Sequence, residues 1–197
     1  MSGKTTNLMR LHDLLNPARR GELMSFETRG DRTLFFDLLP LMIKGADGLK
    51  VKIKLFTVPG QVAHDATRKA VLMRADGVVF VADSQTDQAI NNFASFDNLE
   101  KNISRVGLVF DKLPLVVQFN KRDLDNIVGE DEVRQRWQPT GLPLIFGSAL
   151  KGGGVARTFG LALKGIYRSL CRDTSLDIGA RLGEQDFLSI LPPGTEV

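Results

Sequence analysis

The sequence predicts an α/β fold with a doubly wound, mostly parallel sheet and one antiparallel hairpin at the sheet edge. Three continuous apolar runs are typical of buried parallel strands: residues 77–83, 114–119 and 143–148. They alternate with three stretches of helical periodicity, near residues 87–104, 130–137 and 154–171. This alternation indicates a parallel sheet that helices cover on both faces.

Residues 34–43 and 51–58 are the two strands of the predicted hairpin, and a short glycine-containing segment joins them. In the second strand, apolar residues alternate with Lys52 and Lys54. One face of the hairpin is therefore exposed to solvent, which places its two strands towards an edge of the sheet.

The amino-terminal segment 4–15 carries leucines at helical spacing and ends at Asn16 and Pro17, which predicts a helix that opens at Gly-Lys-Thr. From Pro17 to Asp31 the chain is polar, basic and contains glycine. We expect this part to be a long exposed loop, which is a natural place for a movable segment.

With 197 residues, of which 43% are hydrophobic and 25% charged, the chain is long enough to bury one full core. We expect one domain at residues 1–171, followed by a semi-ordered extension at residues 172–197. The extension carries an apolar cluster that either docks on the domain or stays exposed: Phe187, Leu188, Ile190 and Leu191.

Composition excludes several functional classes. The apolar runs are far shorter than the roughly 20 residues that cross a bilayer, and the polar amino terminus is unlike a secretory segment. The single cysteine, Cys171, fits a reducing compartment, and the C-terminus has no prenylation box. The net charge of +3 is spread along the chain and does not indicate nucleic-acid binding. We therefore expect a cytoplasmic protein without a membrane anchor.

Gly3, Lys4 and Thr5 match the closing half of a phosphate-binding loop. In such a loop, backbone N–H groups at a helix N-terminus cradle phosphates, the lysine neutralises them and the threonine hydroxyl binds Mg²⁺. Thr6 lies in the same first turn and belongs to the predicted site. Alone, this short motif also fits an ordinary polar N-terminus, so the prediction needs support from elsewhere in the chain.

That support comes from Asn120, Lys121 and Asp123, which directly follow a buried strand. A carboxylate at position 123 accepts from both N1–H and the exocyclic amine of guanine, which adenine does not offer. Asn120 would brace the loop, and Lys121 would lay its aliphatic stem on the base. Doubly wound sheets bind ligands at the carboxyl ends of their strands, which favours this interpretation over an ordinary polar loop.

Two weaker motifs occur in the matching order. Ser148 and Ala149 follow the next strand, where their backbone N–H groups would meet the guanine O6. Gly60 would let a backbone N–H approach a γ-phosphate, and Gln61 would orient an attacking water during GTP hydrolysis. Taken alone, the segment from Thr57 to Gln61 would more often be just a turn.

Several segments resemble the MglA-type family of bacterial gliding-motility proteins: residues 31–41, 57–61, 65–69, 77–84 and 120–124. The resemblance covers about residues 3–170 and includes Thr57, where most Ras relatives carry an aspartate. It implies a Ras-like P-loop GTPase fold with GTP or GDP and Mg²⁺ as ligands. It also implies a role as a switch in cell polarity or gliding motility.

The same resemblance assigns further roles by position. Arg32 would be an intrinsic arginine finger, and Gln61 would be the water-orienting catalytic residue. Thr33, together with Thr5, would bind Mg²⁺. The partners would be a Roadblock/LC7-type GTPase-activating protein and polarity effectors. Two alternatives stay open: Arg32 as a solvated loop charge, and a binding module of this fold that does not hydrolyse GTP. An ATP-using kinase is disfavoured because Asp123 selects guanine.

The phosphate-binding loop is incomplete in this sequence. Its consensus places a glycine five positions before Gly3 and a buried strand before that glycine, but the sequence begins at Met1. We therefore expect the chain as given to lack the central first strand and to fold poorly. A start placed at an internal Met codon and a shortened, inactive homologue are the two explanations. The retention of Arg32 and Gln61 favours the first.

Overall fold

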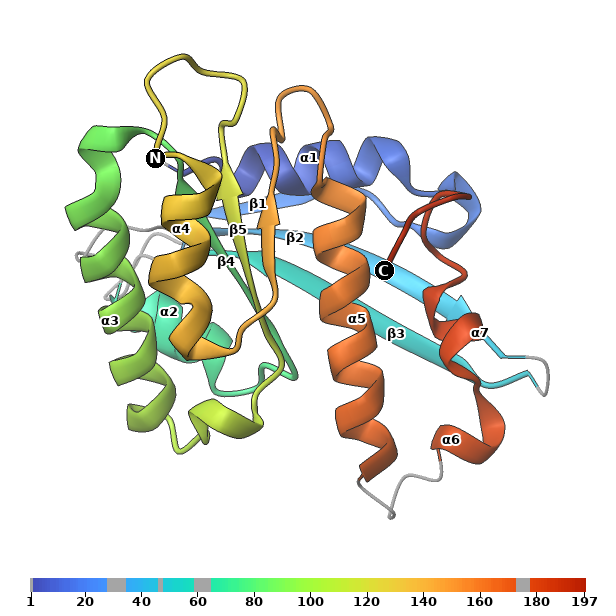
Figure 1. The fold of residues 1–197 in the computed structure, drawn as a ribbon. Coiled ribbons are helices and arrows are strands. Elements are labelled where there is room, and N and C mark those ends of the chain that lie inside the picture. The colour runs from blue at the N-terminus through green and yellow to red at the C-terminus, as the bar shows by residue number, and fades with distance from the viewer. Residues whose placement is uncertain (1, 28–34, 46–47, 59–64, 173–177) are drawn as a thin grey trace.

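The computed structural model describes residues 2–27, 35–45, 48–58, 65–172 and 178–197 (Figure 1). Within these ranges the strands are β1 (Met24–Glu27), β2 (Phe35–Lys44), β3 (Lys50–Thr57), β4 (Val78–Asp83), β5 (Leu115–Asn120) and β6 (Leu144–Phe146). The helices are α1 (Lys4–Leu14), α2 (Asp65–Leu72), α3 (Ala89–Arg105), α4 (Glu130–Trp137), α5 (Val155–Arg172), α6 (Ile178–Arg181) and α7 (Glu184–Leu188). In this described part of the chain, no helix combines the length and the apolar character that a membrane crossing requires.

The strands form two three-stranded sheets. In the first, β2 lies between β1 and β3 and pairs with both in the antiparallel sense. In the second, β5 lies between β4 and β6, and all three are parallel. The predicted hairpin and the three predicted parallel strands are thereby confirmed, as is the α/β class. The exposed lysines of β3 lie on its solvent-facing side, as the alternating pattern predicts.

Strand β1 corrects the prediction of one continuous loop from Pro17 to Asp31. Residues Met24 to Glu27 pair with the start of β2, from Met24 opposite Leu38 to Glu27 opposite Phe35. The ring of Phe26 stacks on that of Phe36 with 5.0 Å between centroids. Four residues of mixed polarity carry too little periodicity to predict a strand, and it is the cross-strand partner that stabilises this one.

The parallel sheet is covered on both faces, because β5 is buried along its whole length. Val117 and Phe119 face the cluster that α3 and α4 line, with Ile103 and Val133 as its fully buried helical members. Val116 points the opposite way, towards Ala162 of α5. A strand buried on both faces is mostly apolar, which explains why apolar residues occupy successive positions from Leu115 to Val117 and do not alternate with polar ones.

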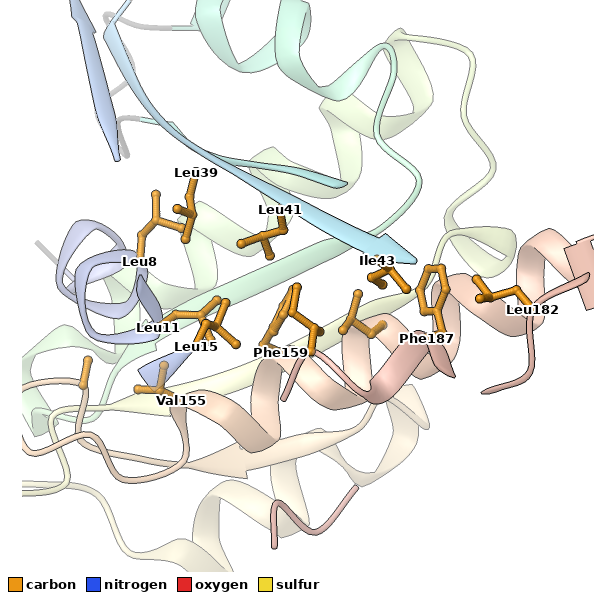
Figure 2. Packing of buried hydrophobic residues seen from close by; sticks show 13 residues of the cluster. Leu8, Leu11, Leu15, Leu39, Leu41, Ile43, Val155, Phe159, Leu182 and Phe187 are labelled. Carbon is orange, nitrogen blue, oxygen red and sulfur yellow. The ribbon is translucent and has the colours of Figure 1, made fainter. Parts of the chain in front are cut away.

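A second core cluster joins α1, β2, α5 and the C-terminal helices (Figure 2). Leu8, Leu11 and Leu15 lie on the buried face of α1 at the spacing of a helical stripe. They face the inward side of β2, which Leu39, Leu41 and Ile43 form by strict alternation.

The C-terminal segment 178–197 completes this cluster. Leu182, Phe187 and Ile190 are each 1% exposed and pack with α5 and β2. A Cβ atom on Gly160 would lie 2.6 Å from a methyl group of Val197, so the chain end packs closely over α5 at this glycine. The tail is therefore built into the same core as α1.

The two sheets are not hydrogen-bonded to each other in the described part of the chain, where β3 and β4 are both edge strands. The sequence predicts one sheet with its first strand missing, and the division between β3 and β4 is where the structure departs from a single continuous sheet. Residue Ser2, directly before α1, lies at the carboxyl end of β5, where Asn120 donates to its carbonyl at 2.8 Å.

Candidate functional site

Asn120 joins the predicted phosphate and base segments. It is 2% exposed at the carboxyl end of β5. Its Nδ2 donates to the carbonyl of Ser2 at 2.8 Å, and its Oδ1 accepts from the N–H of Ala149 at 2.8 Å. One side chain therefore joins the start of α1 to the loop after β6.

Gly3 and Lys4 open α1 directly beside Asn120. Gly3 has φ +90°, and an added Cβ would collide with the Asn120 amide, so only glycine fits this turn. Burial lowers the pKa of Lys4 below 10.5, and the nearby charge of Arg68 on α2 lowers it further. Two cations at a helix N-terminus form a site that favours anions. Thr6 is exposed in the first turn of α1.

Asp123 is oriented by the loop after β6. The hydroxyl of Ser148 donates to Asp123 Oδ1 at 2.6 Å. This hydrogen bond is the main reason that the pKa of Asp123 is lowered, with smaller contributions from the charges of Lys151 and Lys121. The carboxylate is thus ionised at neutral pH and presents acceptors only, as guanine recognition requires.

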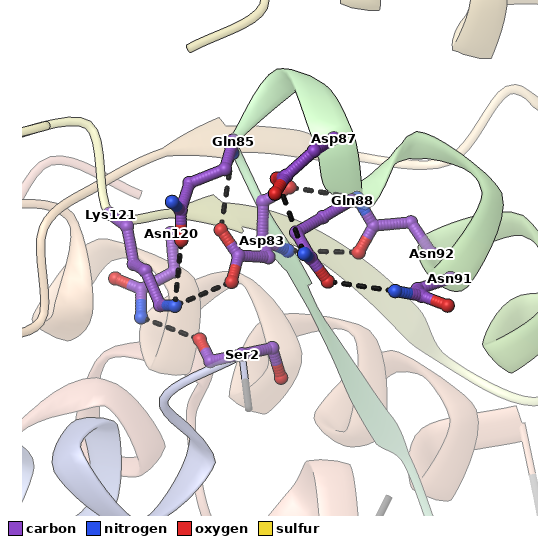
Figure 3. A network of polar contacts seen from close by, with 9 residues as sticks. All are labelled: Ser2, Asp83, Gln85, Asp87, Gln88, Asn91, Asn92, Asn120 and Lys121. Carbon is purple, nitrogen blue, oxygen red and sulfur yellow. Dashed lines mark hydrogen bonds and ion pairs between the residues drawn. The ribbon is translucent and has the colours of Figure 1, made fainter. Parts of the chain in front are cut away.

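The structure adds a contact for Lys121 that sequence reasoning missed (Figure 3). Its Nζ lies 2.5 Å from Oδ2 of Asp83, the last residue of β4, which is 4% exposed. It also donates to Gln85 Oε1 at 3.2 Å. Lys121 has φ +68°, a left-handed conformation that is unfavourable for a residue with a side chain. The ion pair with Asp83 holds the lysine in this conformation.

Asp83 is itself held from α3. The amide of Asn92 accepts from the backbone N–H of Asp83 at 3.0 Å and donates to its carbonyl at 2.7 Å. The sequence signal for Asp83 is a polar residue that closes an apolar strand at the same edge as Asn120. Strand-end carboxylates of this kind are candidates for a site.

Asp37 on β2 is a second buried carboxylate that the sequence analysis did not predict as part of the site. It is 5% exposed and accepts hydrogen bonds from Thr5 at 2.9 Å, Thr57 at 2.6 Å and Ser25 at 2.8 Å. Burial alone would raise its pKa, but the three hydroxyl donors together outweigh burial and lower it. Its signal in the sequence is an acidic residue on the inward face of a strand that otherwise places Leu39 and Leu41 there.

This cluster suits the predicted Mg²⁺ site. Thr5 and Asp37 bring together a hydroxyl and a carboxylate oxygen, which are the hard ligands that Mg²⁺ prefers. Thr57 stands beside them, where most Ras relatives carry an aspartate, and Asp37 supplies the carboxylate from the neighbouring strand. In the described ranges no group of three His, Cys, Asp or Glu residues converges.

The remaining predicted residues fall outside the part of the chain that the structure describes. These are Arg32, Thr33, Gly60 and Gln61.

The predicted phosphate-binding and guanine-binding motifs thus lie together at one edge of a parallel sheet. Their order and spacing along the chain are those of Ras-like small GTPases, and the chain has the Ras-like fold. No protein-family model matches the chain. It is 42% identical over 170 residues to the mutual gliding-motility protein MglA of Myxococcus xanthus (strain DK1622), an alignment that covers 86% of this chain and 87% of the relative. The chain belongs to the MglA family of Ras-like small GTPases.

Proposed function

We propose that the chain is a guanine-nucleotide switch that binds GTP with Mg²⁺ and hydrolyses it to GDP and phosphate. The observation that carries this proposal is the arrangement at the base end of the site. There Asp123 is ionised and oriented by Ser148, while Asn120 joins the same loop to the start of α1. Two acceptor oxygens held in this way match the N1–H and 2-amino donors of guanine.

The phosphate end supports the same function. Lys4 and Arg68 supply positive charge at the N-terminus of α1, where backbone N–H groups also point outward. Thr5, Thr33 and Asp37 would hold Mg²⁺, either directly or through water. When bound, the ion neutralises charge on the β- and γ-phosphates and aligns them for transfer.

The catalytic roles of Arg32 and Gln61 rest on the family resemblance. A guanidinium beside the γ-phosphate stabilises the charge of the transition state, and a glutamine amide orients the attacking water. The matched relative is a gliding-motility protein by name. We propose a corresponding role in cell polarity or motility in the cytoplasm, with a Roadblock/LC7-type activator and polarity effectors as partners. A module of the same fold that binds guanine nucleotides without turnover is the alternative, and measured GTP hydrolysis separates the two functions.

Competition binding with GDP, ADP and xanthosine diphosphate tests the base assignment. Asp123→Asn exchanges acceptors for a mixed donor and acceptor, so its GDP affinity is expected to fall by at least about 10²-fold while xanthosine diphosphate becomes the preferred ligand. The matched control is Asp125→Asn, since Asp125 is exposed in the same loop and its change is expected to leave GDP binding unaltered. Equal affinity of the parent chain for ADP and GDP would rule the assignment out.

A further inference from the structure

Arg10, on the second turn of α1, reaches across to the loop after β6. Its Nη2 donates to the carbonyl of Leu150 at 2.6 Å, and its Nε donates to the carbonyl of Ala149 at 3.4 Å. Its aliphatic stem runs beside Gly152, which has φ +85°. Two neighbouring carbonyls therefore share one planar guanidinium, whose fork of donors suits such a pair.

The loop that Arg10 holds is the loop that orients the base-reading side chains. The N–H of Ala149 donates to Asn120 at 2.8 Å, and the hydroxyl of Ser148 donates to Asp123 at 2.6 Å. Displacement of the peptide groups at 149 and 150 would therefore move the hydrogen-bond partners of both Asn120 and Asp123.

These contacts close a ring around the site. It runs from Ser2 along α1 to Arg10, through the loop 148–150 to Asn120, and back to the carbonyl of Ser2. Since α1 is a rigid element, its phosphate-binding first turn and its Arg10 contact move together. Two side chains close this ring through hydrogen bonds. Arg10 contacts the loop 148–150, and Asn120 contacts both that loop and Ser2.

We infer that Arg10 is a positioning residue for guanine recognition, which fixes the loop 148–150 and, through that loop, the carboxylate of Asp123. This inference rests on the proposed guanine-nucleotide binding and adds a residue that touches neither the base nor the phosphates. The sequence offers no signal for it, because Arg10 occupies an ordinary polar position in an amphipathic helix.

Base analogues separate this role from a general effect on the fold. Arg10→Met keeps the stem and removes all donors. Its affinity for GDP is expected to fall about tenfold. Inosine diphosphate lacks the 2-amine, so its base makes only one hydrogen bond to Asp123, and its affinity is expected to fall less. The ratio of GDP affinity to inosine diphosphate affinity is therefore expected to decrease. Arg136→Met is the matched control, since Arg136 is exposed on α4 and pairs with Glu132. An equal loss for both nucleotides, or none, overturns the inference.

Two further variants sharpen the result. Arg10→Lys offers one flexible ammonium to two carbonyls and is expected to lie between the parent and Arg10→Met. In a Ser148→Ala background, where the loop no longer holds Asp123, Arg10→Met is expected to leave the GDP to inosine diphosphate ratio unchanged. If Arg10→Met narrows the ratio as much in that background as in the parent, the proposed route through Ser148 is wrong.

Amide hydrogen exchange of the nucleotide-free chain provides a readout that does not depend on binding. Arg10→Met is expected to speed exchange at residues 148–152 and to leave β5 unchanged, whereas Arg136→Met changes neither. Unchanged exchange in this loop overturns the inference even if binding is altered. If exchange rises but the parent does not prefer GDP over ADP, the proposed function is wrong and Arg10 is a structural contact only.

Discussion

Asp37 shows how strongly one buried carboxylate depends on its donors. Its three hydroxyl partners come from α1, β1 and β3, so the charge links elements that are distant along the chain. Since the pKa of Asp37 is lowered in the folded state, protonation opposes folding. The stabilisation is fully present above the unfolded value of 3.8 and is lost as the pH falls through the lower folded value.

We therefore predict a specific acid sensitivity. In urea unfolding from about pH 5 down to about pH 2, the parent is expected to lose stability more steeply than Asp37→Asn, because the variant has no carboxylate to protonate. Asp125→Asn, at an exposed position, should follow the parent curve. Parallel curves for the parent and Asp37→Asn would show that the three hydroxyl contacts do not favour the charged form.

The catalytic pair predicted from the resemblance has a kinetic test. Arg32→Ala and Gln61→Ala are expected to bind GTP and Mg²⁺ nearly as tightly as the parent, because their contacts form mainly in the transition state. Single-turnover hydrolysis with a Roadblock-type activator should fall by at least roughly 10²-fold for each. The double variant should be little worse, since the two residues act as a unit.

Thr33→Ala is the control for this experiment. It is expected to weaken the Mg²⁺-dependent GTP state and to leave GDP affinity largely unchanged, because only the γ-phosphate state recruits this segment. Parent-like stimulated hydrolysis by Arg32→Ala would make Arg32 a solvated loop charge.

Motif residues were predictable one by one because their spacing to strand ends is regular. Asn120 and Asp123 follow an apolar run directly, and the structure places both where that position implies. Asp37, Asp83 and Arg10 were not predicted: the strand positions of Asp37 and Asp83 offer only a weak signal, and Arg10 offers none. Their partners lie far away along the chain, and each occupies a position that a solvated or capping residue could fill equally well.

The helix α7 and its preceding turn tie the C-terminal segment to the domain. Phe187 is fully buried with its ring 5.5 Å from that of Tyr167, whose hydroxyl donates to the carbonyl of Leu182 at 2.9 Å. Glu184 adds an ion pair with Arg168 at 3.2 Å. These contacts bridge α5 and the tail, so the segment stabilises the elements it covers.

Phe187→Ala is accordingly expected to lower the free energy of unfolding by about 3–5 kcal/mol, since it removes a fully buried ring. Chemical denaturation measures this change. Gln185→Ala, on the exposed side of the same helix, should cost less than about 0.5 kcal/mol. A loss below about 1 kcal/mol for Phe187→Ala would mean that the tail contributes little to the core.

Long elements were the most predictable, and short ones the least. The pattern of β2 predicts a strand even across Pro40, and the structure shows why the proline is tolerated. The carbonyl of Pro40 accepts from Gly21 on the side where β1 has already ended, so the missing N–H interrupts no ladder there. The four residues of β1 gave no comparable signal, because their stability comes from β2.

The division of the sheet between β3 and β4 has an energetic consequence for the molecule. In the part of the chain that the structure describes, β3 and β4 are edge strands, so each leaves ladder donors and acceptors without a strand partner on its outer side. A strand between β3 and β4 that leads into Gly3 would pair both edges and complete the phosphate-binding loop.

We therefore predict that an amino-terminal extension with an apolar strand, and with a glycine five positions before Gly3, raises the melting temperature and GDP affinity together. An extension of equal length in which prolines interrupt the strand should raise neither, because it cannot pair. Calorimetry and competition binding measure the two effects. If the chain as given already binds GDP at sub-micromolar affinity, the need for this strand is disproved.

The two hydrophobic clusters also differ in when they can form during synthesis. The cluster around β5 draws on residues from 78 to 146, and all of these are synthesised before the C-terminal segment 178–197. The cluster of α1 and β2 needs Phe159, Phe187 and Ile190 from the other end of the chain. Its apolar leucines therefore stay exposed until translation is nearly complete, and it is this half of the molecule that nascent-chain chaperones would have to protect.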